Sequence, residues 1–295
     1  MNDIAQLAVM VLSRRIVRCH RRGMAIPIRT RANMRPRMPE ARDPKERFSD
    51  RVDDYVRYRP GYPPALIELL SSVCGLGPRC TVADIGSGTG IFSRLLLRTG
   101  ARVMAIEPNA SMRAEAERSL AAEGGLTSIA ASAEETTLPT ASVDLVTAAQ
   151  AFHWFHPERT RAELSRILRP GGAVALIWNQ RQESPFNTDY ERMLEQFAPE
   201  YAGVRESNRA AEPKLRAFFD PVVPRFAGFV HEQRFDEGGV RGRLTSSSYA
   251  PQPGHPFYEP MMARLREIFA AHQRGGEVTF GYQAIVWYGP LTPAR

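Results

Sequence analysis

Apolar residues follow two different spacings along the chain from residue 80 onwards. Short, nearly continuous apolar runs rich in β-branched residues predict strands that are buried on both faces. Segments whose apolar residues recur every three or four positions predict amphipathic helices between these strands. The predicted strands are 80–85, 102–106, 127–131, 143–147 and 173–178, and the predicted helices are 89–98, 109–122 and 157–168. This alternation is typical of a doubly wound α/β sheet whose strands are mostly parallel.

The flanking segments are less regular but add elements to this core. A proline- and glycine-rich break at 59–64 separates two predicted helices, 47–58 and 65–71. The sequence Arg-Pro-Gly-Gly at 169–172 predicts a helix stop and a turn into the strand that follows. Further downstream we expect helices with proline breaks within 186–225, a helix at 257–273 and long strands at 226–235 and 278–288. The sequence therefore predicts a Rossmann-like, seven-stranded, mostly parallel sheet with a late antiparallel strand and a helical lid.

The chain divides by composition into an arm, residues 1–39, and one domain, residues 40–295. A length of 295 residues is enough for one large α/β domain with an ample core. Within it we expect lid helices in 40–75 and partly helical cap insertions in 186–275.

The net charge of +7 comes from the arm, which holds nine arginines and a single acid, Asp3, whereas the rest holds thirty bases and thirty-one acids. Nucleic-acid binding requires a basic surface, so we expect no nucleic-acid partner for the domain. The arginine-rich, acid-poor arm is compatible with an organelle transit peptide. We favour a disordered arm or a later start at Met24, Met34 or Met38.

The cysteine content and the hydropathy indicate in which compartment the protein is located and whether it associates with a membrane. Cys19, Cys74 and Cys80 form no paired framework, which favours a reducing compartment, and we predict a cytoplasmic location. No apolar run is long enough to cross a bilayer, so no membrane association is expected. No histidine and cysteine spacing indicates a metal site, and the oligomeric state is left open.

A glycine-dense turn follows the first strand of the alternating region, in the pattern Asp84-Ile-Gly86-Ser87-Gly88-Thr-Gly90. Glycines let a backbone approach a ligand closely. A dinucleotide loop has the spacing G-x-G-x-x-G, and an acid before its first glycine would repel a pyrophosphate. The same acid could pair with an ammonium group, so the pattern favours a nucleoside-like, cationic ligand. S-adenosylmethionine has both properties.

A second acid supports this interpretation. Glu107 and Pro108 follow the next predicted strand, about 20 residues beyond the glycine loop. An acid at such a strand end is placed to accept hydrogen bonds from both ribose hydroxyls. Without a ligand, the same residues would be a tight turn and a helix-capping glutamate.

With these motifs in order, residues 47–291 resemble the seven-strand class I S-adenosylmethionine-dependent methyltransferases. More narrowly, they resemble the small-molecule subgroup that includes trans-aconitate and cantharidin-type methyltransferases. The segments that carry the narrower resemblance are 48–49, 55–63, Gln-Ala-Phe-His-Trp-Phe at 150–155 and Trp-Asn-Gln-Arg at 178–181.

The resemblance implies roles for individual residues. Asp84, Gly86, Ser87, Gly88 and Gly90 would surround the methionine part of the cofactor, and Glu107 with Pro108 would bind its ribose. Met112, Ala133 and Glu134 would lie beside the adenine. Gln150, Ala151 and Phe152 would lie at the end of the fourth strand, next to the reacting methyl group.

Three residues are candidates for the methyl-accepting centre. His153 follows the fourth strand, where it could act as a base that titrates near neutrality, or simply form part of the wall. Arg59 and Arg181 are candidate clamps for a carboxylate of the substrate or of the cofactor, or ordinary surface ion-pair residues. Arg243 and Tyr249 are placed at the mouth of the substrate site.

The function that we predict is methyl transfer from S-adenosylmethionine to a carboxylate or hydroxyl of a small molecule by in-line displacement. One alternative is an RNA or protein methyltransferase, although the Asn/Asp-Pro-Pro-Tyr box for a flipped base is absent. A second is a cofactor-binding protein without catalytic activity. A third, a nicotinamide oxidoreductase, is disfavoured by the glycine spacing.

Overall fold

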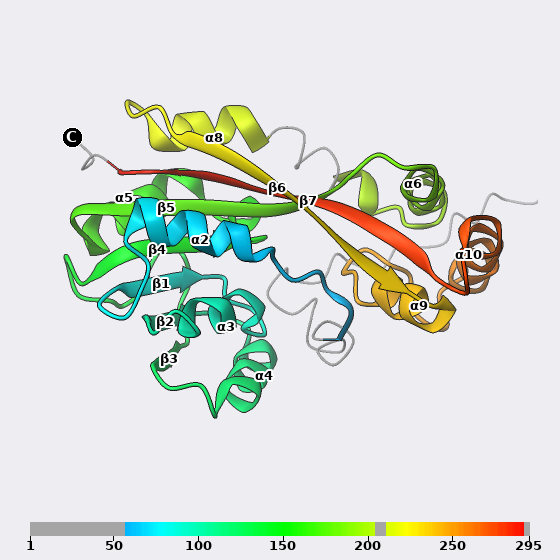
Figure 1. Ribbon diagram of the computed structural model, residues 1–295, viewed down its shortest axis with the longest axis horizontal. Coiled ribbons are helices and arrows are strands. Elements are labelled where there is room, and N and C mark those ends of the chain that lie inside the picture. The colour runs from blue at the N-terminus through cyan, green and yellow to red at the C-terminus, as the bar shows by residue number, and fades with distance from the viewer. Residues whose placement is uncertain (1–56, 204–210, 292–295) are drawn as a thin grey trace, which may run out of the picture. The chain divides into compact units, whose positions relative to one another are not determined.

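A computed structural model describes residues 57–203 and 211–291 of the chain. Its centre is a seven-stranded sheet with the order β3-β2-β1-β4-β5-β7-β6 (Figure 1). The strands are β1 (Thr81–Ile85), β2 (Arg102–Ile106), β3 (Leu126–Ile129), β4 (Val143–Ala149), β5 (Leu168–Arg181), β6 (Arg225–Phe235) and β7 (Val278–Gly289). The first five pair in parallel, and β7 runs antiparallel to both of its neighbours, β5 and β6. The predicted sheet, including one late antiparallel strand, is confirmed.

Helices cover both faces of the sheet. One face packs against residues of α2 (Pro64–Cys74), α3 (Ile91–Leu97) and the end of α4 (Ala110–Leu120). The other packs against α5 (Pro157–Ile167), α8 (Ala211–Phe219) and the short helix η2 (Phe152–Trp154). Strand order reverses between β1 and β4, and ligands of open α/β sheets bind at such a reversal, beyond the carboxyl ends of the strands.

A separate hydrophobic cluster lies where the long strands β6 and β7 run beyond the parallel part of the sheet (Figure 1). It joins the start of β7 to α6 (Pro185–Phe197), α9 (Glu237–Thr245) and α10 (Tyr258–His272). We call this cluster with its three helices the cap. None of the helices in the described residues is long and apolar enough to cross a membrane.

The structure corrects two expectations about the elements. Residues 169–172 do not form a turn before the strand, because β5 already begins at Leu168 and contains them as a bulge. Leu168 pairs with Val143 on β4 and Ala173 pairs with Leu145, so the four residues between Leu168 and Ala173 have no pairing partner on β4. Gly171, in this bulge, takes a positive φ of 81°. Helix α9 was not predicted, because its segment has three glycines and little apolar periodicity. Asp236 starts it by accepting a hydrogen bond from the Gly239 amide.

Other expectations are not decided by the structure. The arm at 1–39 and most of the helix predicted at 47–58 lie outside the described residues. The assignment of 40–75 as lid helices and of 186–275 as cap insertions remains a prediction about their roles.

Candidate functional site

A cavity of about 1020 Å³ opens at the carboxyl ends of β1, β4 and β5. Its size is at the upper end of the range of small-molecule sites. The glycine loop lines it with Asp84, Gly86, Ser87, Gly88 and Thr89, and the strand ends add Gln150, His153 and Arg181. Arg59 from the segment before α2 and Arg243 and Tyr249 from the cap complete this part of the wall. Part of the predicted cofactor set therefore shares one cavity with the three acceptor candidates, whereas Glu107, Pro108 and Met112 do not line it.

The glycine loop takes a conformation that side chains would prevent. Gly86, Gly88 and Gly90 all have positive φ, at 67°, 57° and 82°. A Cβ on Gly86 would lie 2.5 Å from the Cβ of Ala151. A Cβ on Gly88 would meet only the Met112 sulfur, at an ordinary contact distance of 3.8 Å, so the surroundings of this residue have room for one. Gly90 starts α3 and packs against Leu120 without lining the cavity.

Glu107 is tied directly to this loop. Its carboxylate accepts hydrogen bonds from the Gly88 amide at 3.0 Å and the Asn109 amide at 2.8 Å. The side chain is buried, and burial raises its pKa above the ordinary value despite these bonds. Pro108 next to it is exposed. The predicted partnership of the glycine loop and the second acid is therefore present as a contact.

Asp84 lies beneath the loop and is almost completely buried. One carboxylate oxygen accepts a hydrogen bond from the Ser93 hydroxyl at 2.6 Å, and the other accepts from the Thr147 hydroxyl at 2.8 Å. Burial raises its pKa to about 6, although both hydrogen bonds oppose the shift. Sequence reasoning missed Ser93 and Thr147, because single hydroxyl residues within apolar runs carry no pattern of their own.

The end of β4 has a strained backbone at Gln150, a non-glycine residue with a φ of 61°. Its amide donates to Ile177, and its side chain donates to the Asn179 carbonyl at 3.1 Å. Such strain is found disproportionately at functional sites. Gln150 lines the cavity, whereas neither Ala151 nor Phe152 does.

Ala151 and Phe152 pack behind the residues that line the cavity. Ala151 is buried directly under Gly86, and Phe152 packs edge-on against Trp178 and Phe218 in the core. Of the three residues placed next to the reacting methyl group, only Gln150 faces the cavity.

Ala133 and Glu134 do not line the cavity either. Glu134 accepts a hydrogen bond from the His156 amide at 2.8 Å, at the start of α5. Burial pushes the pKa of Glu134 upwards, but the hydrogen bonds outweigh it and the net pKa is lowered. His156 occupies the N-cap position of α5, but its side chain makes no capping bond. The Glu134 carboxylate instead accepts the hydrogen bond from the His156 amide at this helix end.

His153 faces the cavity with an unusual protonation state. Burial, and then the charge of Arg59, lower its pKa to about 4, so the expectation that it titrates near neutrality is wrong. Its Nδ1 atom is buried and has no hydrogen-bond partner among the described residues. The imidazole is therefore neutral at pH 7.

Arg59 belongs to a segment, residues 58–62, that connects the sheet to the cap. Its guanidinium donates to the Ser246 carbonyl at 2.9 Å, and the Gly61 carbonyl accepts from the Asn179 side chain. Tyr62 packs edge-on against Phe92 at 4.9 Å. The segment borders the cavity over the glycine loop, where the sequence resemblance places a lid.

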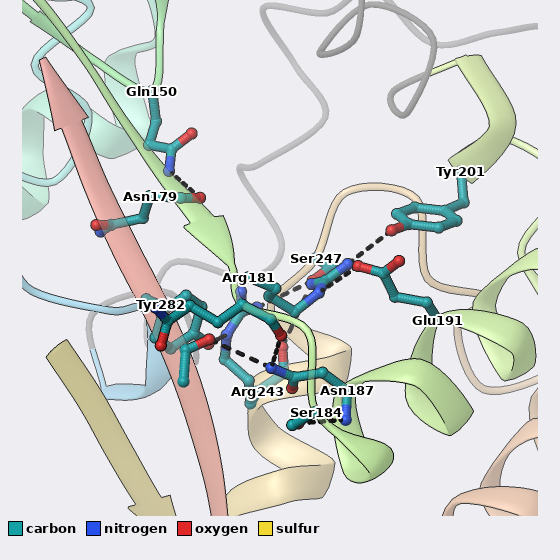
Figure 2. A network of polar contacts seen from close by, with 12 residues as sticks. Gln150, Asn179, Arg181, Ser184, Asn187, Glu191, Tyr201, Arg243, Ser247 and Tyr282 are labelled. Atoms are coloured by element: carbon teal, nitrogen blue, oxygen red, sulfur yellow. Dashed lines mark hydrogen bonds and ion pairs between the residues drawn. The ribbon is translucent and has the colours of Figure 1, made fainter. Parts of the chain in front are cut away.

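Arg181 is the last residue of β5 and points into the cap (Figure 2). Its Nε lies 3.2 Å from a Glu191 carboxylate oxygen, and its Nη2 donates to the Tyr201 hydroxyl at 2.7 Å. The guanidinium also lies over the rings of Tyr190 and Tyr201. It is thus a buried cavity residue and not a surface ion-pair residue. Among the described residues no cluster of acids, histidines and cysteines could hold a metal ion.

Comparison with known proteins agrees with this geometry. Residues 83–176 match a family described as a methyltransferase domain. Over 146 residues the chain is 38% identical to an uncharacterized methyltransferase of Mycobacterium tuberculosis, covering 48% of this chain and 56% of that protein. It is 31% identical over 150 residues to an uncharacterized methyltransferase of Schizosaccharomyces pombe, covering 50% and 59%. The chain thus spans somewhat more than half the length of these curated relatives.

Solved structures extend the likeness beyond the matched segment. A protein of Anaeromyxobacter dehalogenans, described as a candidate type II methyltransferase, aligns with a TM-score of 0.59 at 26% identity. The alignment covers 80% of this chain and all of that chain. The family and the fold both point to S-adenosylmethionine as the cofactor. The room beside Gly88 and the buried acids Asp84 and Glu107 fit such a ligand. Residues 83–176 therefore match a methyltransferase domain, and the seven-stranded sheet that contains them has the fold of the solved methyltransferase structure.

Proposed function

We propose that the protein methylates a small molecule at a carboxylate or hydroxyl oxygen, with S-adenosylmethionine as the methyl donor. The observation that carries the proposal is the single cavity that joins the glycine loop to His153, Arg59 and Arg181. Arg243 and Tyr249 of the cap line the same cavity, and its volume of about 1020 Å³ suits a small acceptor.

The cofactor would be held by residues of the first half of the domain. Gly86, Ser87 and Gly88 would contact its methionine part, with Asp84 beneath them supplying negative charge for the ammonium group. Glu107 would accept hydrogen bonds from the ribose hydroxyls, and Met112 would pack near the adenine. An adenine contact of Glu134 would require it to keep or exchange its bond to the His156 amide. When bound, the cofactor supplies an electrophilic methyl group.

The remaining residues would position the acceptor. Holding two reactants in line can contribute about 7–11 kcal/mol to lowering a barrier. A hydroxyl acceptor can donate its hydrogen bond to the neutral His153 ring, which takes the proton as the new bond forms. A carboxylate acceptor needs no base and is held instead by Arg181 or Arg59.

The same proposal includes the finer points of the resemblance: a place in the trans-aconitate and cantharidin-type subgroup, and a cytoplasmic location. RNA or protein methylation is the alternative. Against it stands the near-neutral charge of residues 40–295.

The test is calorimetric titration with S-adenosylhomocysteine, with NAD as the control ligand, on the wild type, Glu107→Ala and Glu115→Ala. Glu115 is a matched control, because it is a glutamate of equal exposure, 7%, whose partner is Arg118 on the same helix. We expect the wild type to bind S-adenosylhomocysteine and not NAD. The affinity of the Glu107 variant for S-adenosylhomocysteine should fall at least about tenfold, and the Glu115 variant should bind it like the wild type. Failure of the folded wild type to bind would refute the proposal.

The acceptor class is then tested by scanning small acids and phenols for S-adenosylhomocysteine production. With a hydroxyl acceptor, His153→Ala should lower kcat by about 100-fold, whereas with a carboxylate acceptor kcat should change little. Turnover of RNA or of proteins but of no small molecule would favour the alternative.

A further inference from the structure

The cap side of the cavity contains two arginines with little exposure, and a carboxylate pairs with one of them, Arg181. The Arg181 side chain is 12% exposed and Arg243 is 4% exposed. They come from β5 and α9, and each lies within range of the other's positive charge (Figure 2). Glu191 pairs with Arg181, through one contact at 3.2 Å.

Arg243 has only neutral partners among the described residues. Its Nε donates to the Tyr282 hydroxyl and its Nη1 donates to the Ser247 hydroxyl, both at 3.2 Å. Buried charges in proteins are normally paired, because removing an ion from water without a counter-ion is costly. Within residues 57–203 and 211–291, the cap side of the cavity therefore has more positive charge than neighbouring side chains neutralise.

The excess of positive charge also acts on a neighbouring phenol, that of Tyr249. Tyr249 lines the cavity beside Tyr201, with ring centroids 5.0 Å apart. Burial raises the pKa of Tyr249, but the charges of Arg181, Arg243 and Arg59 outweigh it and lower the pKa to about 8. This part of the cavity favours negative charge strongly enough to promote loss of a phenolic proton.

We propose that Arg243 and Arg181 form an anion subsite that binds a carboxylate or phosphate group of the acceptor, separate from the atom that receives the methyl group. Guanidinium groups bind both kinds of anion with paired hydrogen bonds. This inference rests on the proposed function for the identity of the ligand as an acceptor. It narrows the substrate class: Arg59 is then left to hold a reacting carboxylate, and a carboxylate acceptor would carry at least two anionic groups.

The subsite predicts a pH dependence through Tyr249. The charged groups around it are Arg59 before α2, Arg181 on β5, Glu191 on α6 and Arg243 on α9, and the phenols are Tyr190, Tyr201 and Tyr282. Once Tyr249 loses its proton, its negative charge satisfies the arginines and repels an incoming anion. Anion affinity should therefore fall as the pH rises through about 8, by about tenfold between pH 7 and pH 9.

The experiment is calorimetry on the full chain saturated with S-adenosylhomocysteine, with three probes: glutarate, its neutral diamide glutaramide, and inorganic phosphate. We expect an anion to bind and glutaramide to bind on the order of 100-fold more weakly. Comparison of glutarate with phosphate identifies which anion the subsite prefers. Equal binding of glutarate and glutaramide would overturn the proposal.

Variants separate this subsite from the cofactor site. Arg243→Gln should weaken anion binding at least about tenfold while the affinity for S-adenosylhomocysteine stays within about twofold. Tyr249→Phe should retain anion binding at pH 7 and remove its pH dependence, which gives a readout even if the arginine variant does not fold. Unchanged anion affinity in folded Arg243→Gln, or an unchanged pH profile in Tyr249→Phe, would refute the subsite. If the wild type binds no S-adenosylhomocysteine, the proposed function fails first, and that result is distinct from a cofactor-loaded protein that binds no anion.

Discussion

Replacing Asp84 by asparagine should make the ligand-free protein more resistant to rising pH. Asp84 is 1% exposed, and its only hydrogen-bond donors in the structure are the Ser93 and Thr147 hydroxyls. Two neutral donors do not compensate a buried negative charge, so its pKa is raised. An asparagine keeps the size and much of the hydrogen bonding of this side chain and removes the charge.

The magnitude follows from the two protonation equilibria. The pKa rises from an ordinary 3.8 to about 6, which corresponds to about 3 kcal/mol of the free energy of unfolding. Because the folded pKa is the higher one, the folded state binds the proton more tightly. The stabilisation from this proton is complete below pH 3.8 and is lost as the pH rises through about 6. About 1 kcal/mol of that loss falls between pH 5 and pH 7.

Urea denaturation of the wild type and Asp84→Asn at pH 5 and pH 7, without ligand, measures this difference. Any hydrogen bond that asparagine fails to make should cost the same free energy at both pH values, so only the change between them is informative. We expect the variant to gain about 1 kcal/mol relative to the wild type between pH 5 and pH 7, and to bind S-adenosylhomocysteine more weakly. A stability difference that is the same at the two pH values would refute the reasoning.

Two further predictions concern the glycine loop and α5. Gly86→Ala should destabilise the protein by a few kcal/mol because its Cβ would clash with Ala151, whereas Gly88→Ala should cost only about 1 kcal/mol for its positive φ, in thermal denaturation. Titration should show that Gly88→Ala nevertheless weakens S-adenosylhomocysteine binding, and normal affinity would contradict its place in the site. Hydrogen bonds from Arg166 and Thr136 outweigh burial and lower the pKa of Glu163 to about 2. Glu163→Gln should therefore lose about 1–2 kcal/mol at pH 7, and the wild type should lose the same stabilisation as the pH falls from 4.5 through about 2, which acid titration followed by circular dichroism checks.

The fold and the cofactor side of the site could be predicted from sequence because their signals are local. The glycine loop joins β1 to α3 within a few residues, and Glu107 follows the adjacent strand. Parallel pairing of β1 with β2 brings both strand ends to the same edge of the sheet, so local order alone sets Glu107 against Gly88. The partners of Asp84 were missed, because they depend on which hydroxyl faces inward from α3 and β4.

The acceptor side could be predicted only as isolated candidates. His153 was given an ordinary pKa because its burial and the approach of Arg59 arise from packing across more than ninety residues of sequence. Helix α9 went unrecognised, since its glycines conceal a buried face that includes Arg243. An arginine in a glycine-rich segment is ordinarily exposed, and only the cap shows that this one is buried.

The difference between the two sides has a physical basis in how the chain is packed. The loop that would hold the cofactor is fixed by the sheet and its flanking helices, whereas the arginine-containing wall belongs to the separate hydrophobic cluster of the cap. Residues of the cap that face the cavity can change without disturbing the packing of β1 or α3. A methyltransferase domain built in this way can keep one cofactor site while its cap determines the acceptor. The two arginines of the cap have too few neighbouring carboxylates to balance their charge. We take this as evidence about the acceptor, because the loop that would hold the cofactor has acids of its own and does not need the arginines.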